Sequence, residues 1–170
     1  MTNWKGIFGG ASLAAVETIE IYVDDVFGIE VSVIDSGQVN FRNVACGLVW
    51  PVGVIAPRTN TDGTLIYTDG TLFTGLSTDL IVKQLGDEIG ISKSIKSGVS
   101  ISQVGSIATV QFVALAEGEG EIALVKLEAN DIENGQPVSR YTASDGSVIV
   151  NASPVIQPTK TVIFKVRVVK

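Results

Sequence analysis

The residues that could carry chemistry are a single thiol, Cys46, and two pairs of adjacent acids, Asp24-Asp25 and Asp87-Glu88. The chain contains no histidine, so the commonest general base and zinc ligand is missing. Adjacent residues of a strand point to opposite faces, so neither acidic pair forms an acid–base dyad by itself. We therefore expect a protein that is not an enzyme.

Cys46 lies in an apolar run, VACGLV at 44–49. No histidine or second cysteine is present to activate its thiol. We predict that it is a small buried hydrophobic side chain rather than a nucleophile.

Calcium is the one cofactor that the sequence allows, because loop carboxylates are its preferred ligands. The candidates are Asp24, Asp25, Asp131 and Glu133. The segment 130–135, NDIENG, is acidic but lacks the ligand spacing of an EF-hand loop. The alternative is that these residues are turn formers and solvated acids.

The aromatic side chains allow a second kind of site, a platform on which sugar rings could stack. Trp4, Trp50, Tyr22, Tyr67 and Tyr141 are the candidates. They are far apart in the sequence, so core packing or an interface is the more common role for such residues.

The elements that must position these residues have a period of two, which is typical of strands. Apolar side chains fall on one face of each of several segments: Ile19, Ile21 and Val23; Phe27, Ile29, Val31 and Val33; Ala108, Val110, Phe112 and Ala114; Val162, Phe164, Val166 and Val168. Asp-Gly and Asn-Gly pairs between the segments favour tight hairpins. The pattern predicts an all-β antiparallel sandwich, with more than about 35% strand and less than about 12% helix.

Two segments do not follow a simple strand pattern. The residues 77–86 fit either a short capped helix or a strand, and we favour strand or turn. In 121–127, EIALVKL, the apolar positions change phase by one residue, which predicts a β-bulge or a bend between sheets.

The order of these pieces resembles cohesin domains, the sandwich modules of cellulosome scaffoldins. The stretch 105–118, GSIATVQFVALAEG, looks like a late cohesin strand and turn, and 121–127 and 145–150 follow in the same order. Upstream, 26–33, VFGIEVSV, is similar to another cohesin strand. The resemblance implies a nine-stranded jelly roll, a non-catalytic role and a dockerin-like protein partner.

The chain is expected to have three parts. We expect an N-terminal arm at 1–16, a sandwich at 17–151, and a linker with an extra C-terminal strand at 152–170. The apolar piece of the arm is short for a signal peptide, and no apolar run is long enough for a transmembrane span.

Composition points to assembly with other proteins. The net charge of −6 argues against binding nucleic acid, which needs clustered Lys and Arg. Charged residues make up 18% of the chain, against about 25% in an average soluble protein, and mean hydropathy is +0.37. We expect some of this apolar surface to be covered by neighbouring subunits in a homo-oligomer or polymer.

The main functional hypothesis is therefore a subunit of an extracellular fibre, tube or sheath joined by strand exchange. The proposed connectors are Trp4, Ile7, Phe8 and Leu13 in the arm and Val162, Phe164, Val166 and Val168 in the last strand. For that last strand, closing its own sheet is an equal alternative. Two other functions stay open: a cohesin-type module at the cell surface or outside the cell, and a viral or phage structural protein.

Overall fold

A computed structural model describes residues 18–35, 40–139, 149–150 and 160–170. The described residues form strands and connecting turns, with no helix. The twelve strands are β1 (Thr18–Tyr22), β2 (Val26–Asp35), β3 (Asn43–Val49), β4 (Ile55–Pro57), β5 (Tyr67–Asp69), β6 (Thr78–Leu85), β7 (Glu88–Ile95), β8 (Gly105–Ala114), β9 (Gly118–Glu133), β10 (Gln136–Ser139), β11 (Ile149–Val150) and β12 (Lys160–Val169).

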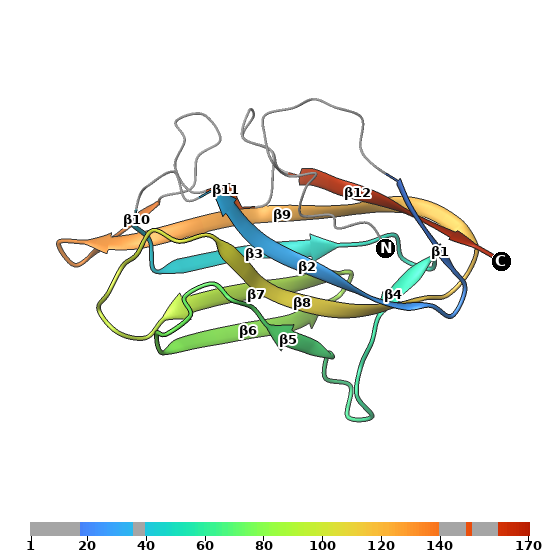
Figure 1. Ribbon diagram of the computed structural model, residues 1–170, viewed down its shortest axis with the longest axis horizontal. Helices are drawn as coiled ribbons and strands as arrows, with labels where there is room; N and C mark the ends of the chain where they lie inside the picture. The colour runs from blue at the N-terminus through green and yellow to red at the C-terminus, as the bar shows by residue number, and fades with distance from the viewer. Residues whose placement is uncertain (1–17, 36–39, 140–148, 151–159) are drawn as a thin grey trace.

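The strands build two facing sheets, as expected for a jelly-roll sandwich. Sheet A has seven strands in the order β1-β12-β9-β3-β7-β6, with β10 also paired to β9. Sheet B has five strands in the order β11-β2-β8-β4, with β5 also paired to β8. Figure 1 shows β2 and β8 of sheet B running across sheet A. The all-β prediction is confirmed, and 77–86 contains a strand, β6, rather than a helix.

The nine strands that the resemblance implies become twelve in the structure. The segment between β3 and β6 contributes two strands of only three residues, β4 and β5. A hairpin separates them, held by the Thr59–Leu65 bridge and turned at Asp62-Gly63, where glycine has φ +85°. The hairpin projects from the body of the sandwich (Figure 1).

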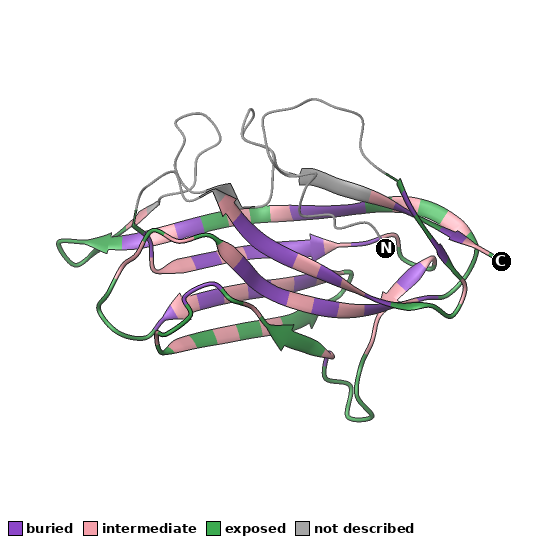
Figure 2. Cartoon of the chain, in the orientation of Figure 1, coloured by how far each residue is buried: buried purple, intermediate pink, exposed green. Residues whose placement is uncertain are grey.

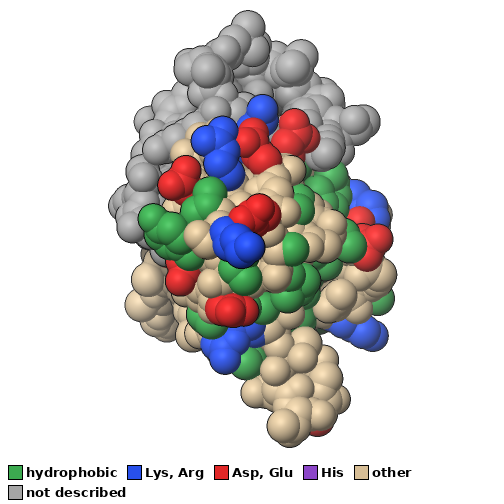
Figure 3. Space-filling model, turned by 90° about the vertical axis from the view of Figure 1, so that its right-hand side faces the viewer, with side chains coloured by type: hydrophobic (Ala, Val, Ile, Leu, Met, Phe, Trp, Pro, Cys, Tyr) green, Lys and Arg blue, Asp and Glu red, His purple; other side chains and the backbone are tan. Residues whose placement is uncertain are grey.

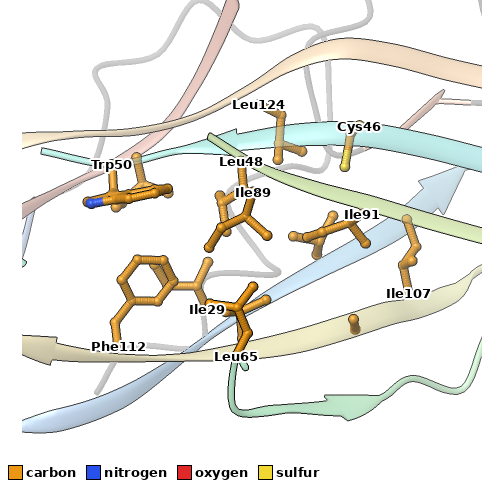
Figure 4. Close-up of a cluster of buried hydrophobic side chains, with 14 of the residues drawn as sticks. Ile29, Cys46, Leu48, Trp50, Leu65, Ile89, Ile91, Ile107, Phe112 and Leu124 are labelled. Carbon is orange, nitrogen blue, oxygen red and sulfur yellow. The ribbon is translucent and has the colours of Figure 1, made fainter. Parts of the chain in front are cut away.

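The core is the layer between the two sheets, and the predicted faces supply it. Alternate residues of β2 and β8 are buried, so that their strands appear striped in Figure 2. Phe112 has the central position: its ring lies 6.1 Å from that of Phe27 and 5.8 Å from that of Trp50. Figure 4 shows Phe112 and Ile29 facing Leu48, Ile89 and Trp50 across this layer. Trp50 is thus a core side chain and not part of a sugar platform.

The phase change predicted in 121–127 is present. Ile122 and Leu124 face the core, and after Lys126 the buried positions become Ala129 and Asp131. Lys126 has φ +53°, and the register between β3 and β9 shifts at this point. The bulge lets the long strand β9 present an apolar face to the core on both sides of it.

The C-terminal strand lies inside its own sheet. β12 pairs in parallel with β1 and antiparallel with β9. Val166 and Val168 are buried in the core of the same chain. Of the two arrangements considered for this strand, the single chain has the one in which it closes its own sheet, and the residues 160–170 belong to the sandwich.

A lysine links the two sheets through the core. Lys93 on β7 is only 3% exposed in its side chain, and its Nζ donates to Asp69 Oδ1 at 2.7 Å and to the Gly70 carbonyl at 2.9 Å. Asp69 is the last residue of β5 in sheet B, so the contact joins the two sheets. It lies where β5 is attached to β8 through only three paired residues. A buried ammonium without such partners would be costly.

We expect Phe112→Ala to lower the free energy of unfolding by about 3–5 kcal/mol, the usual cost of deleting a buried aromatic ring. Leu115→Ala is the control, because Leu115 is 48% exposed and should change stability by less than about 0.5 kcal/mol. Urea denaturation measures both. Equal effects would mean that the core is not centred on Phe112.

A second prediction concerns the lysine between the sheets. Asp69→Ala leaves the Lys93 ammonium buried without its anion and should cost about 1–3 kcal/mol. Lys93→Met should cost less, because replacing a buried charge by an apolar side chain of similar volume is often nearly neutral. The double variant should be more stable than Asp69→Ala alone. If Lys93→Met is the most destabilised of the three, the prediction is wrong, and the hydrogen bond of the ammonium to the Gly70 carbonyl stabilises the fold more than the pairing with Asp69 does.

Candidate protein-binding face

The four acids proposed for calcium lie in two separate places. Asp24 and Asp25 form the turn between β1 and β2, where the Tyr22 backbone N–H donates to Asp25 Oδ2 at 3.0 Å. Asp131 and Glu133 are at the end of β9, beside the β10 hairpin. Among the described residues no cluster of three or more Cys, Asp or Glu side chains could hold a metal ion. The four acids therefore do not share a site.

Asp131 has partners of its own. It is 6% exposed, accepts a hydrogen bond from the Ser100 hydroxyl, and lies 3.7 Å from Arg42 Nε. Its Oδ1 also accepts from the Ile132 backbone N–H at 2.8 Å. The carboxylate is part of the packing between β9 and the segments around Phe41 and Ile101, which bridge each other.

The proposed assembly residues are mostly outside the part that the structure describes. Trp4, Ile7, Phe8 and Leu13 lie in 1–17, and for Val162 and Phe164 only the backbone pairing of β12 is described. Val166 and Val168 are 1% and 2% exposed and pack in the core of their own chain. Their part in assembly stays a prediction.

A different surface has the character of a binding site: the outer face of β9, β3, β7 and β6, here called the outer face of sheet A. Period-two alternation places large residues of β7 inward, such as Ile89 and Ile91, and small residues outward, such as Gly90 and Ser92. β3 does the same with Ala45 and Gly47. Gly47 and Gly90 are opposite each other in the register. Because it carries only small side chains, the centre of this face is lower than the surface around it.

Larger side chains surround this low centre. Ile81 and Leu85 on β6 are 59% and 63% exposed, and both border the same depression. With Lys83, Lys126 and Glu128 they enclose a shallow, mainly apolar hollow of about 310 Å³. An apolar floor with a charged rim is typical of a surface that binds another protein.

The two glycines of the floor differ in what they do. A Cβ on Gly47 would stand 2.3 Å from Glu88 Oε1, because the Glu88 side chain lies over this glycine. In that position Glu88 Oε2 reaches Lys126 Nζ on β9 at 2.9 Å, so an ion pair spans β3. A Cβ on Gly90 would meet only the Lys83 carbonyl oxygen, at 3.7 Å. A side chain at position 47 would displace Glu88 from its place beside Lys126, whereas the space above Gly90 is open.

The described surface has a second hollow, of about 410 Å³, lined by residues 117–119 and 167–170. On the end of the molecule seen in Figure 3, acidic and basic side chains alternate and do not gather into a basic patch. No helix in the described part of the chain is long and apolar enough to cross a membrane.

Cys46 is on the inner side of the same strand, β3. It is 5% exposed and points into the core (Figure 4), as predicted. Burial, with the nearby Glu88 carboxylate as the smaller cause, raises the pKa of the thiol from 9.0 to about 12. A thiol with so high a pKa is not a nucleophile at neutral pH.

The outer face of sheet A was not among the sites predicted from the sequence. The available signal was the alternation in 88–95, EIGISKSI, where small residues separate isoleucines. That pattern predicts a strand with one buried face, but the pairing of Gly90 with Gly47 depends on two strands that are 39 or more residues apart.

The architecture defines the class: an antiparallel β-sandwich of jelly-roll type. No protein-family model matches the sequence, and no curated protein matches it. The fold is similar to solved cohesins. One is a non-cellulosomal cohesin from Archaeoglobus fulgidus (17% identity, TM-score 0.52, covering 91% of this chain and 88% of that one).

Two further cohesins have the same likeness. The seventh ScaB type I cohesin from Pseudobacteroides cellulosolvens has 12% identity and a TM-score of 0.56, over 91% of this chain and 89% of that one. A type II cohesin from Acetivibrio cellulolyticus, solved in a Cohesin-X-Dockerin complex, has 15% identity and a TM-score of 0.51, over 62% of this chain and 71% of that one. The fold is therefore cohesin-like, as the sequence resemblance implied.

The raised pKa of Cys46 gives a prediction about pH. The folded chain holds the thiol proton more tightly than the unfolded chain, so the free energy of unfolding should fall as pH rises from about 9 towards 12. Cys46→Ala should remove this part of the pH dependence. Urea denaturation at a series of alkaline pH values measures it. Rapid labelling of the native protein by a bulky thiol reagent at neutral pH would contradict the burial.

Proposed function

We propose that the protein is a non-catalytic recognition module that binds a partner protein on the outer face of sheet A. The observation that carries this proposal is the shallow hollow with a glycine floor, beside the exposed Ile81 and Leu85. A flat sheet face with an apolar centre and a charged rim suits a rigid partner of complementary shape.

The fold likeness supports a dockerin-like partner as the first to test, because one similar structure is a Cohesin-X-Dockerin complex. An extracellular or cell-surface location belongs to the same proposal. Strand exchange through the arm at 1–16 stays a prediction. Through β12 it would require Val166 and Val168 to leave the core of their own chain, and for this reason we do not propose it as the main function.

Gly90 and Gly98, which both have open space where a side chain would stand, allow a sharp test. Gly90→Tyr adds a large side chain over the hollow, and its Cβ meets only the Lys83 carbonyl oxygen at an ordinary contact distance of 3.7 Å. We therefore expect a folded protein that binds its partner at least about tenfold more weakly, a change of about 1.4 kcal/mol. Gly98→Tyr is the matched control, because Gly98 is equally open but lies in the loop after β7, away from the hollow. Calorimetry with purified dockerin modules, alone and with their X modules, measures the affinities.

The outcomes are distinct. Binding that Gly90→Tyr weakens and Gly98→Tyr leaves unchanged supports the face. Binding that both variants leave unchanged places the partner elsewhere on the molecule. No binding of any dockerin module by the wild-type protein would contradict the dockerin-like partner.

A further inference from the structure

The open edge of sheet A is a strand with unused backbone groups. β6 pairs with β7 on one side, and no described strand pairs with it on the other. In Figure 1 the hairpin between β4 and β5 extends beyond β6 near one end of this strand. Such an edge is a template for another strand unless something blocks it.

The hydrogen-bond phase of β6 follows from the bond next to it. The Lys96 backbone N–H donates to the Ser77 carbonyl at 2.9 Å, in register with the β6–β7 pairs. Bonded residues alternate along an antiparallel strand, so the odd-numbered residues of β6 turn their backbone groups to β7. The even-numbered ones turn N–H and C=O to the open edge: Thr78, Leu80, Val82 and Gln84.

We infer that this edge pairs with the same edge of a second copy of the chain, antiparallel, about a two-fold axis through Ile81. In that register Leu80 and Val82 exchange backbone hydrogen bonds with Val82 and Leu80 of the other copy, and Thr78 does so with Gln84. All the unused backbone groups of β6 then find partners. The two copies of sheet A become one continuous sheet.

Charge selects this register over its neighbours. Centred on Ile81, the register sets Asp79 of each copy opposite Lys83 of the other, and Ile81 opposite Ile81. Centring on residue 80 or 82 instead sets Ile81 opposite Asp79 or Lys83, and centring on residue 79 or 83 sets like charges opposite each other. Opposite charges across a strand pair stabilise it and like charges destabilise it.

The exposed side chains of β6 agree with this pairing. Ile81 is 59% exposed in the single chain. In the dimer it would contact Ile81 of the other copy at a non-hydrogen-bonded position, where side chains of paired strands are closest. Asp79 Oδ1 lies 3.0 Å from Lys96 Nζ, in an exposed ion pair that contributes little. Its Oδ2 faces no described cation and is available to Lys83 of the other copy.

The other long edge of sheet A does not have this property. β1 has five residues with Glu20 at the centre, so an antiparallel pair using the whole strand would oppose two carboxylates. The free strands of sheet B have three residues or fewer. The pairing through β6 goes beyond the proposed function, because it uses the backbone edge of the sheet and places the outer face of sheet A on the same side of both copies. Ile81 and Lys83, which also line the hollow, would lie at the junction of the two copies.

Sedimentation of the wild-type protein over a wide concentration range should show a reversible monomer–dimer equilibrium. Lys83→Asp sets two carboxylates opposite each other twice in each dimer, and should raise the dissociation constant about tenfold or more. Arg167→Asp is the control, since it makes the same change of net charge at an exposed residue of β12 and should leave the dimer unchanged. A wild-type protein that is monomeric even at millimolar concentration would overturn the inference.

Mixing provides the decisive experiment. Asp79→Lys and Lys83→Asp should each be monomeric where the wild type dimerises, yet the mixture should form heterodimers, because every Lys then faces an Asp. Gly90→Tyr should leave the dimer intact, which separates edge pairing from self-association through the hollow. Failure of the mixture to dimerise, or loss of the dimer in Gly90→Tyr, would overturn the assignment of the β6 edge.

Discussion

The structure depends on one constraint: the inner faces of two sheets must meet in a dry apolar layer. Phe112 on β8 contacts Phe27 on β2 of the same sheet and Trp50, which follows β3 of the other. Because side chains alternate along a strand, filling this layer consumes every second residue of the strands on both sides. The remaining residues point outward, and their size and polarity are not restricted by packing in the core.

The outer face of sheet A carries small residues at several of these outward positions. Ile89 and Ile91 hold β7 against the core, and the residue between them can therefore be glycine without loss of packing. Gly47 is similarly placed between buried residues of β3, and its missing side chain admits the Glu88–Lys126 ion pair. The centre of the face is thus low because Gly47 and Gly90 lie on strands that are held in place by core residues on their inner side.

Two features adjust the layer where simple alternation would fail. At Lys126 a positive φ changes the phase of β9, so that a sixteen-residue strand can keep an apolar face inward along its length. At Lys93 an inward position carries a charge, which Asp69 and the Gly70 carbonyl satisfy from the other sheet. Sheet A ends at β1 on one side and at β6 on the other, and the outer backbone groups of β6 are used by no described strand.

The sequence by itself determined the all-β class, the inner faces of β2 and β8 and the phase change before Leu127, because each of these is a local pattern of period two. The burial of Cys46 followed instead from its apolar neighbours at 44–49. The sequence did not predict β4, β5 and β7. It could not determine which strands are neighbours. The pairing of β12 with β1 joins residues more than 140 positions apart, and the hollow joins β3 to β7 and β6. The scattered acids were grouped by composition, but the fold placed them at separate turns. Only the tertiary structure decides such proximities, since they arise from long-range hydrogen-bond registers that no short segment encodes.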